Sequence, residues 1–388
     1  MRLLAKIDMP AVTRLVRAGR LGEAMVVLRG RHLDPRPQGE AGPRPGSDLL
    51  PGPGSAPGRN GTARAAAPER VRPLYRSFGG IPGFDGLVGP APDPVLVDVP
   101  DKARFEERAW ADAAGRRTYK LYVPSRYDGR AMPLVVMLHG CTQSPDDFAL
   151  GTRMNVVAEE QGFLVAYPAQ SASANASKCW NWFNTGDQRR DRGEPSLIAG
   201  ITRQIQRDFA VAPGRIYVAG LSAGGAAAAI MGQQYPDLYA AIGVHSGLAC
   251  GAASDMASAF GAMRHGGRAA TGSGTQSSAV PTIVFHGDGD ATVNPINGDR
   301  VVAQSKAGIE LRTTVEQGVA PGGIRFTRTI EVDRSGRTLV EHWILHGAGH
   351  AWSGGSPAGS YTEPRGPDAS REMIRFFLRQ PATAGLGG

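Results

Sequence analysis

A serine in a glycine-flanked turn is the first feature of the sequence that could do chemistry. Residues 220–224 read Gly-Leu-Ser-Ala-Gly and fit the pattern G-x-S-x-G. A buried strand is expected before this segment and a helix of small residues after it, so its glycines would allow a sharp turn that exposes the hydroxyl of Ser222. The pattern predicts that Ser222 is a catalytic nucleophile. The alternative is an ordinary glycine-rich turn.

A serine hydroxyl is a weak nucleophile at neutral pH, so it needs a base and a carboxylate that orients the base. In hydrolases with this kind of turn, the chain order is serine, acid, histidine. Asp290 follows an apolar strand in HGDGDATV, and His350 lies in HGAGHAWSGG before the last helix. We therefore predict that Asp290 orients His350. The rival acid, Asp288, is expected to shape the turn instead, and the preference for Asp290 rests partly on a family resemblance given below.

Other histidines are less well placed for this chemistry. His346 ends a strand, and His139 and His286 occur in His-Gly turns that can simply shape loops. His245 follows a strand, where it could line the substrate pocket or be a satisfied core histidine.

A tetrahedral intermediate of ester hydrolysis needs two N–H donors for its oxyanion. One is expected from Ala223, the residue after the nucleophile, and the other from the loop after the strand PLVVMLHG. Cys141 directly follows that strand, so its backbone N–H is the second candidate. The alternative is that Cys141 is a small buried residue, and its backbone N–H can serve as the donor in that case as well.

Apolar segments along the chain predict the elements that position these residues. Continuous apolar runs typical of buried strands occur at residues 133–140, 163–168, 215–220, 240–247, 281–287 and 338–347. An alternating strand is expected over residues 117–127, and helical spacing occurs over residues 148–161, 197–209, 224–236 and 368–378. Strands that alternate with helices predict an α/β domain with a mostly parallel sheet flanked by helices.

The first hundred residues have a different composition. Residues 1–33 show helical spacing and predict a short helical N-terminal extension, whereas residues 34–100 are rich in Pro, Gly, Ala and Arg and predict a flexible linker. Residues 101–380 are left as the catalytic domain. The whole chain of 388 residues carries 53 glycines and 29 prolines, which agrees with a folded core diluted by such a linker.

Charge and composition exclude several function classes. The formal net charge is +8, but many arginines lie in the first 76 residues and no basic stripe is interleaved with aromatic residues, so nucleic-acid binding is not expected. No 18 apolar residues run together, so no transmembrane segment is expected. The cysteine spacing matches no zinc site, and the predicted chemistry needs neither a metal nor an organic cofactor.

Several blocks of the sequence together resemble the polyhydroxybutyrate depolymerase family of esterases, an α/β-hydrolase group with relatives that act on feruloyl and acetylxylan esters. The blocks are LHGCTQSPDDFA, CWNWFNTGDQRRDRGEPSLI, VAGLSAGGAAAAI, HSGLACG, DMASAFGAMR, HGDGDATVNPIN and GAGHAWSGGSPAGSYTEPRGPDASREMIRFF. The resemblance covers roughly residues 117–378. It implies an α/β-hydrolase fold and an ester hydrolase that uses Ser222, Asp290 and His350, with Cys141 and Ala223 as oxyanion donors.

The resemblance does not fix the substrate. Polymeric or oligomeric 3-hydroxyalkanoate esters are expected, and a feruloyl or acetylxylan type of carboxylesterase is the alternative. A granule-associated scaffold with an inactive hydrolase fold is the alternative outside enzymes, although the intact triad argues against it. The expected partners are an ester or polyester substrate and a polymer granule surface. The sequence leaves the oligomeric state open.

Aromatic residues near the predicted site are candidates for a pocket wall. Trp180 and Trp182 share the loop CWNWFN, and Trp352 lies two residues after His350. We expect them, with His245, to contact the substrate, and packing in a core beneath a long loop is the alternative.

The three cysteines, Cys141, Cys179 and Cys250, all lie near the predicted site. One disulfide and one free thiol are possible, with Cys141–Cys179 as the first choice. The N-terminus lacks the apolar region and cleavage site of a secretion signal, so a cytoplasmic location, with a polymer granule as one place within it, is expected. A reducing cytosol would keep all three cysteines as thiols.

Overall fold

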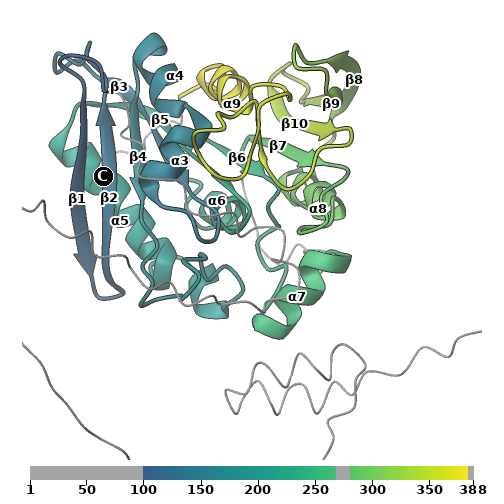
Figure 1. Ribbon diagram of the computed structural model, residues 1–388, viewed down its shortest axis with the longest axis horizontal. Coiled ribbons are helices and arrows are strands. Elements are labelled where there is room, and N and C mark those ends of the chain that lie inside the picture. Colours follow the sequence, from purple (N-terminus) through teal and green to yellow (C-terminus); the bar gives the residue numbers. More distant parts are fainter. Residues whose placement is uncertain (1–98, 268–279, 307, 383–388) are drawn as a thin grey trace, which may run out of the picture. The chain divides into compact units, whose positions relative to one another are not determined.

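A ten-stranded sheet forms the centre of the computed structural model, which describes residues 99–267, 280–306 and 308–382 (Figure 1). In spatial order its strands are β1 (Arg104–Asp112), β2 (Gly115–Val123), β4 (Leu164–Pro168), β3 (Met132–Leu138), β5 (Val211–Leu221), β6 (Ala241–His245), β7 (Thr282–Gly287), β10 (Thr338–Leu345), β9 (Arg325–Val332) and β8 (Arg312–Val319). The six strands from β4 to β10 are parallel, and antiparallel pairs close both edges. The expected α/β class is confirmed.

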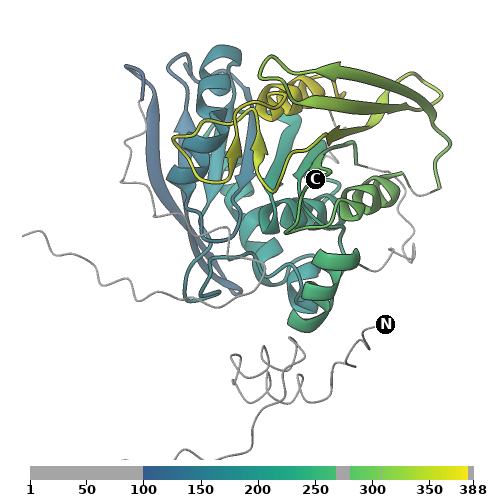
Figure 2. The same cartoon turned by 45° about the vertical axis from the view of Figure 1, so that its right-hand side comes forward.

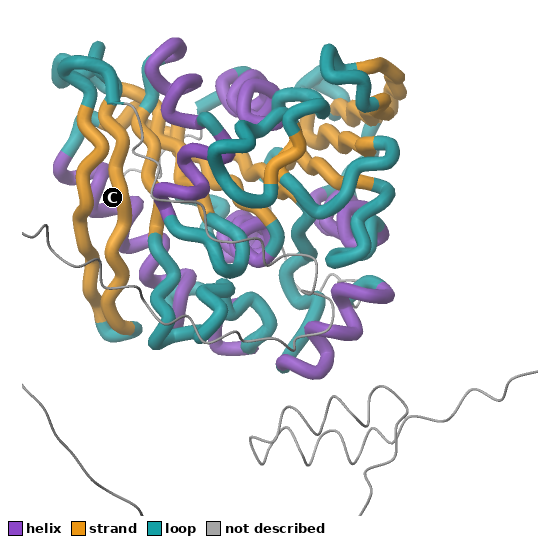
Figure 3. The backbone as a smooth tube through the Cα atoms, in the orientation of Figure 1, coloured by secondary structure: helices purple, strands orange, loops and turns teal. Residues whose placement is uncertain are grey.

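Helices cover both faces of the sheet (Figure 3). Two separate hydrophobic cores lie between these helices and the sheet. On one face lie α3 (Pro145–Thr152), α4 (Met154–Gln161) and α9 (Ala369–Leu378). On the other lie α5 (Gly193–Asp208), α6 (Ala223–Gln234), α7 (Met256–His265) and α8 (Ile296–Ser305). Because both faces are covered, β4, β6 and β7 are buried along their whole length, which explains their continuous apolar sequences.

The single helix expected over residues 148–161 is wrong. The structure has two short helices, α3 and α4, and Arg153 between them adopts a left-handed backbone with φ of 55°. The hydroxyl of Thr152 donates to the carbonyl of Phe148 at 2.7 Å, which satisfies one carbonyl group of the ending helix. The chain thus turns at Arg153, although the apolar spacing continues across it.

The β8–β9 hairpin was not predicted from the sequence. It extends the sheet beyond β10 (Figure 2), and nearly all of β8 is exposed. A strand with neither face buried carries no alternation of apolar and polar residues, so the pattern used for the other strands is missing here. A further small sheet pairs β11 (Trp352–Ser353) with β12 (Thr362–Glu363), just after the predicted base.

The predicted N-terminal extension, residues 1–33, and almost all of the predicted linker, residues 34–100, lie outside the described residues, so both stay predictions. The domain boundary at residue 101 lies among the described residues, but nothing tests it, so it also stays a prediction. Within the part of the chain that the structure describes, no helix is long and apolar enough to cross a membrane.

Packing of α9 on the sheet allows a test of the second core. Phe377 is fully buried and stacks on Tyr217 of β5 with ring centroids 4.9 Å apart. Truncation should leave a cavity, so we expect Phe377→Ala to lower the free energy of unfolding by about 3–5 kcal/mol. Urea titration measures this value. Arg379→Ala, an exposed change two residues away, is the control, and equal effects of the two changes would contradict this packing.

Candidate active site

Ser222 lies in the turn between β5 and α6 with φ of 58° and ψ of −120°. A residue other than glycine rarely adopts such a positive φ, and holding one there costs roughly 1–3 kcal/mol. Two backbone hydrogen bonds of 2.9 Å maintain the conformation: the Ser222 N–H donates to the carbonyl of His245, and the Ser222 carbonyl accepts from the N–H of Ala226. The expected strained turn is therefore present.

The glycines on either side of Ser222 are needed because three segments of backbone meet here. A Cβ on Gly220 would lie 2.6 Å from the carbonyl oxygen of Leu138, and a Cβ on Gly224 would lie 2.6 Å from that of His139. Both distances are too short for real side chains. The serine turn therefore packs directly against the end of β3 and the start of the loop that follows it.

Asp290 and His350 form a buried pair. The Nδ1–H of His350 donates to Oδ2 of Asp290 at 2.7 Å, and the other carboxylate oxygen accepts the N–H groups of Thr292 and Val293 at 2.9 and 2.8 Å. Burial opposes the charge of Asp290, but hydrogen bonds from His286 and His350 outweigh it and lower the pKa of this carboxyl group. The ionised carboxylate holds the ring with Nδ1 protonated, which leaves Nε2 as the basic nitrogen.

The strand register brings the three predicted residues to one edge of the sheet. Leu221 of β5, His245 of β6 and Phe285 of β7 are successive neighbours, and Phe285 also pairs with Trp343 of β10. Ser222, Asp290 and His350 follow the carboxyl ends of β5, β7 and β10. Among the described residues no hydrogen bond joins Ser222 to His350. Such bonds are often long in unliganded enzymes, and the catalytic role of the three residues stays a prediction.

Asp288, the alternative candidate for the acid, pairs with a different histidine, His346. Asp288 accepts from Nδ1 of His346 at 2.9 Å and from the N–H of Gly347 at 2.6 Å, and Nε2 of His346 contacts the hydroxyl of Thr327 at 2.9 Å. Both partners are substantially exposed. Asp288 thus ties the loop after β7 to the end of β10, in agreement with its expected role in shaping the turn.

The loop after β3 carries the candidate oxyanion donor, the N–H of Cys141. The neighbouring backbone groups are bound as follows: His139 O by Trp180 Nε1 (3.1 Å), Gly140 N–H by Gln143 Oε1 (2.8 Å), Gly140 O by His139 Nδ1 (2.7 Å), Cys141 O by Thr142 Oγ1 (2.6 Å) and Thr142 N–H by Ser177 O (2.7 Å). Within the described chain the N–H of Cys141 finds no protein acceptor, and neither does that of Ala223, the first residue of α6. Both groups are free to bind an anion.

The predicted disulfide is confirmed. Cys141 is bonded to Cys179, and Cys250 is a free thiol whose pKa burial raises to about 11. The bond joins the loop after β3 to the segment around Trp180, so the candidate oxyanion donor is covalently held.

Three of the four expected substrate contacts belong to the core instead. Trp180 and His245 are 0% exposed and Trp352 is 1% exposed. Trp352 stacks on His245 at 5.1 Å and donates to the hydroxyl of Ser370 at 3.1 Å. A side chain without exposed surface cannot touch a substrate that approaches from solvent, so this expectation is corrected for these three residues. For Trp182, 6% exposed, it stays a prediction.

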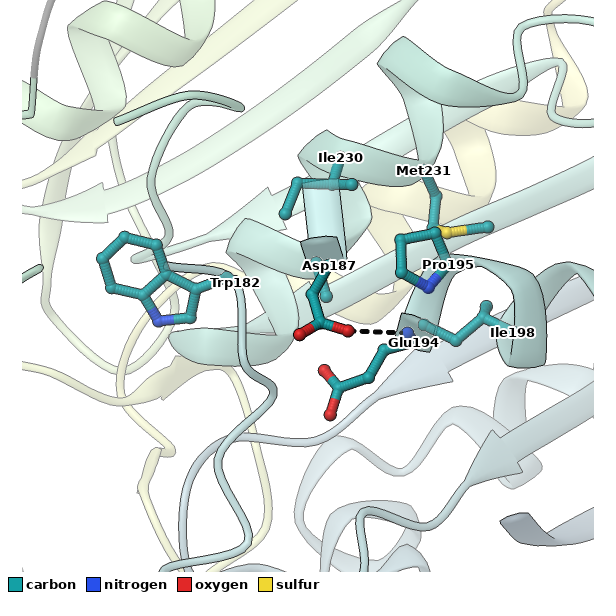
Figure 4. Close-up of a pocket in the computed structure, with 8 residues that line it drawn as sticks. Trp182, Asp187, Glu194, Pro195, Ile198, Ile230 and Met231 are labelled. Carbon is teal, nitrogen blue, oxygen red and sulfur yellow. Dashed lines mark hydrogen bonds between the residues drawn. The ribbon is translucent and has the colours of Figure 1, made fainter. Parts of the chain in front are cut away.

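Trp182 borders a cavity between α5 and α6 (Figure 4). Ile198, Ile230 and Met231 supply apolar walls, while the carboxylate of Asp187 accepts from the N–H of Glu194 at 2.8 Å beside them. The volume is about 10 Å³, room for about one water molecule. This cavity is too small for an acyl group and is not the substrate pocket.

Glu194 is a structural anchor that sequence reasoning missed. This buried carboxylate accepts from the backbone N–H of Asn181 at 2.7 Å and its amide at 2.9 Å, and from the amide of Gln170. Burial raises its pKa. Glu194 thereby holds the segment that carries Cys179 and Trp180. The neighbouring sequence does not show that an acid at the start of a helix accepts hydrogen bonds from residues far away in the chain.

Comparison with solved structures places the fold among the α/β-hydrolases. The acetyl xylan esterase from Aspergillus awamori matches with a TM-score of 0.55 over 71% of this chain and 99% of that chain, at 20% sequence identity. This likeness shows the fold alone. The sequence profile of the Esterase PHB depolymerase family matches residues 117–315, just over half of the chain, and the chain belongs to that family.

Two relatives illustrate the range of the family. The poly(3-hydroxyalkanoate) depolymerase C of Paucimonas lemoignei is 34% identical over 241 residues, which cover 59% of this chain and 57% of that protein. The feruloyl esterase B of Thermothelomyces thermophilus is 27% identical over 250 residues, which cover 59% of this chain and 82% of that protein. The chain thus spans little more than half the length of the depolymerase.

Three buried histidines predict how stability depends on pH. Burial lowers the pKa of His139 and His342 to about 4 and that of His245 to about 3, whereas an unfolded chain binds these protons near pH 6.5. Above about pH 6.5 these histidines are neutral in both states and the free energy of unfolding does not depend on them. As pH falls towards 4, only the unfolded chain binds their protons, so the free energy of unfolding decreases by up to about 1.4 kcal/mol per pH unit for each histidine.

Urea unfolding between pH 7 and 4.5 measures this slope, and His342→Leu isolates one histidine from the carboxylates. Nε2 of His342 has no hydrogen-bond partner, so the change removes a titrating group without breaking a bond at that atom. We expect the variant to take up about one proton fewer on unfolding and to show a flatter slope. An unchanged slope would mean that His342 is not buried in its neutral form.

Proposed function

We propose that the protein is a serine carboxylic ester hydrolase that cleaves oligomeric or polymeric 3-hydroxyalkanoate esters. Family membership and the similarity to a poly(3-hydroxyalkanoate) depolymerase support the reaction and the substrate class. The observation that carries the proposal is the buried hydrogen bond between His350 and an ionised Asp290, at the sheet edge where Ser222 occupies a strained turn. This combination supplies a base, an orienting acid and a partly exposed nucleophile together.

The reaction proceeds through an acyl-enzyme. Nε2 of His350 accepts the proton of Ser222 Oγ as this oxygen attacks the ester carbonyl. The N–H groups of Ala223 and Cys141 stabilise the oxyanion, and His350 then protonates the departing alcohol. Water that loses a proton to His350 attacks the acyl-enzyme, the bond to Ser222 Oγ breaks, and His350 returns the proton to Oγ as the acid leaves. Asp290 stabilises the imidazolium in both halves of the reaction.

A second candidate function is hydrolysis of feruloyl or acetylxylan esters. The similarity to a feruloyl esterase B, of which the chain covers 82%, favours it. The role of a catalytically inactive granule scaffold is less well supported, because the strained turn at Ser222 and the hydrogen bond between His350 and Asp290 favour a catalytic site. A polymer granule surface is the partner that the first proposal implies.

The cellular location is a further proposal. The cytoplasm is the location proposed, and the disulfide Cys141–Cys179 argues against it, because disulfides are typical of oxidising compartments. The redox state of this pair in cells decides between the two.

Substitution of the catalytic residues tests the mechanism. We expect Ser222→Ala and His350→Gln to lower kcat for a p-nitrophenyl ester by about 10⁴-fold or more, and Asp290→Asn to lower it by about 10³- to 10⁴-fold. The solvated pair Asp288–His346 provides matched controls, because Asp288→Asn and His346→Gln should keep most of the activity. If Ser222→Ala hydrolyses the ester at the rate of the unchanged protein, the nucleophile assignment is wrong.

A substrate panel tests the specificity. We expect kcat/KM for 3-hydroxybutyrate oligomers of defined length to exceed that for methyl ferulate and acetylated xylan by at least about tenfold, the discrimination that a fitted pocket commonly gives. The reverse order would favour the second candidate. If no ester is cleaved and a fluorophosphonate fails to label Ser222, the scaffold role replaces both.

A further inference from the structure

A buried glutamine holds the loop that carries the candidate oxyanion donor Cys141. Gln143 lies between β3 and α3 and is 2% exposed. Its Oε1 accepts the N–H of Gly140 at 2.8 Å, and its Nε2 donates to Oδ2 of Asp147 at 3.0 Å and to the carbonyl of Ser360 at 3.2 Å. Because one partner is a donor and the others are acceptors, only one orientation of the amide satisfies all three.

The position of this glutamine relates directly to the serine. A Cβ placed on Gly140 would lie 3.1 Å from Oε1 of Gln143 and 3.6 Å from the Cβ of Ser222. Both side chains therefore lie beside Gly140, around the space that a Cβ there would fill. Any shift of the Gly140 backbone that followed loss of the Gln143 hydrogen bond would move the loop relative to the nucleophile.

Peptide planarity transmits this hold to the N–H of Cys141. The peptide between residues 139 and 140 is fixed at both ends, by Trp180 at its carbonyl and by Gln143 at its N–H. The next peptide is held at its carbonyl by His139, and because a peptide is planar, fixing the carbonyl also sets the direction of the Cys141 N–H. Gln143 is the partner that occupies the Gly140 N–H, so of these two successive N–H groups only that of Cys141 has no acceptor in the described chain.

The same side chain reaches the segment that follows the base. Ser360 lies ten residues after His350, and Asp147 accepts both its N–H at 2.8 Å and its hydroxyl at 2.5 Å. Gln143 and Asp147 thus join the loop after β3, the first turn of α3 and the chain beyond His350. Partly buried hydrogen bonds therefore connect the loop to the segment that follows the candidate base.

We infer that Gln143 is a positioning residue of the oxyanion site, which orients the Cys141 N–H towards the oxygen that becomes charged and ties this donor to the segment after His350. The inference rests on the proposed ester hydrolysis. Gln143 touches no reacting atom in this arrangement. Its contribution is made in the transition state, when the carbonyl oxygen becomes an anion, so its loss lowers kcat rather than raising KM.

The test compares Gln143→Met with Gln380→Met. Gln380 is a matched control because it is 3% exposed and its amide bonds to Thr338, Phe376 and Arg337 at the end of α9. Methionine keeps the length of the side chain and removes the hydrogen bonds. Both changes should lower the melting temperature, whereas only Gln143→Met should lower kcat, by about 10- to 100-fold, which approaches the loss of a whole oxyanion donor.

The affinity for a transition-state analogue distinguishes a positioning role from a merely structural one, because loss of a merely structural residue would leave this affinity unchanged. A trifluoromethyl ketone forms a tetrahedral adduct with the serine, and its affinity should fall in Gln143→Met by the same factor as kcat, while KM and the affinity for the product acid stay near their original values. Equal kcat values in the two methionine variants, or a change confined to KM, would overturn the inference.

Two further comparisons keep the test decisive. If Gln143→Met does not fold, Gln143→Leu, which also removes the acceptor for Gly140, is compared with Gln380→Leu, and equal kcat values for those two overturn the inference. The proposed function fails separately: the unchanged protein would then neither cleave esters nor be labelled at Ser222 by a fluorophosphonate. An active unchanged protein with an equally active Gln143→Met variant refutes the positioning role alone.

Discussion

The close approach of three backbone segments around Ser222 is the constraint on which the site depends. Leu138 at the end of β3 pairs with Gly220 in β5, and the absence of side chains at Gly220 and Gly224 lets the turn pack against that strand end. As a consequence, the loop after β3 and the first turn of α6 emerge side by side. Their free N–H groups, at Cys141 and Ala223, come from these two neighbours. A larger residue at either glycine would force nucleophile and donors apart.

Two Asp–His pairs of similar geometry lie near this edge, and their surroundings distinguish them. Asp290 and His350 are buried, and two backbone N–H groups also stabilise the carboxylate. Asp288 and His346 are largely solvated, and their bond spans the loop after β7 and the end of β10. Because water screens charge, only the buried pair gives its carboxylate a strong hold on the ring and on the positive charge it acquires. The solvated pair stabilises the loops that carry the other.

Much of the fold follows from the sequence because the parallel strands are buried on both faces and therefore have continuous apolar sequences. The exposed β8 lacks that signal, and the left-handed Arg153 divides a segment whose spacing suggests one helix. The placement of Ser222, Asp290 and His350 at one edge of the sheet could be predicted because a fixed chain order accompanies the turn, whereas their catalytic roles stay predictions. The burial of Trp180 could not be predicted, because its indole N–H donates to the carbonyl of His139, a residue 41 positions away. Gln143 and Glu194 are equally dependent on distant partners.

Those distant partners hold the oxyanion loop from both sides. Glu194 and the disulfide fix the segment around Trp180 on one side, and Gln143 fixes Gly140 on the other. Donors held in this way need no rearrangement when charge develops, which is the main source of electrostatic catalysis. For the proposed ester hydrolysis, such rigidity serves any ester equally well. With Trp180, His245 and Trp352 buried, the selectivity of that proposed reaction falls to exposed residues beside the loop. Thr142, which is exposed and contacts the hydroxyl of Tyr361 at 3.0 Å, lies at that position.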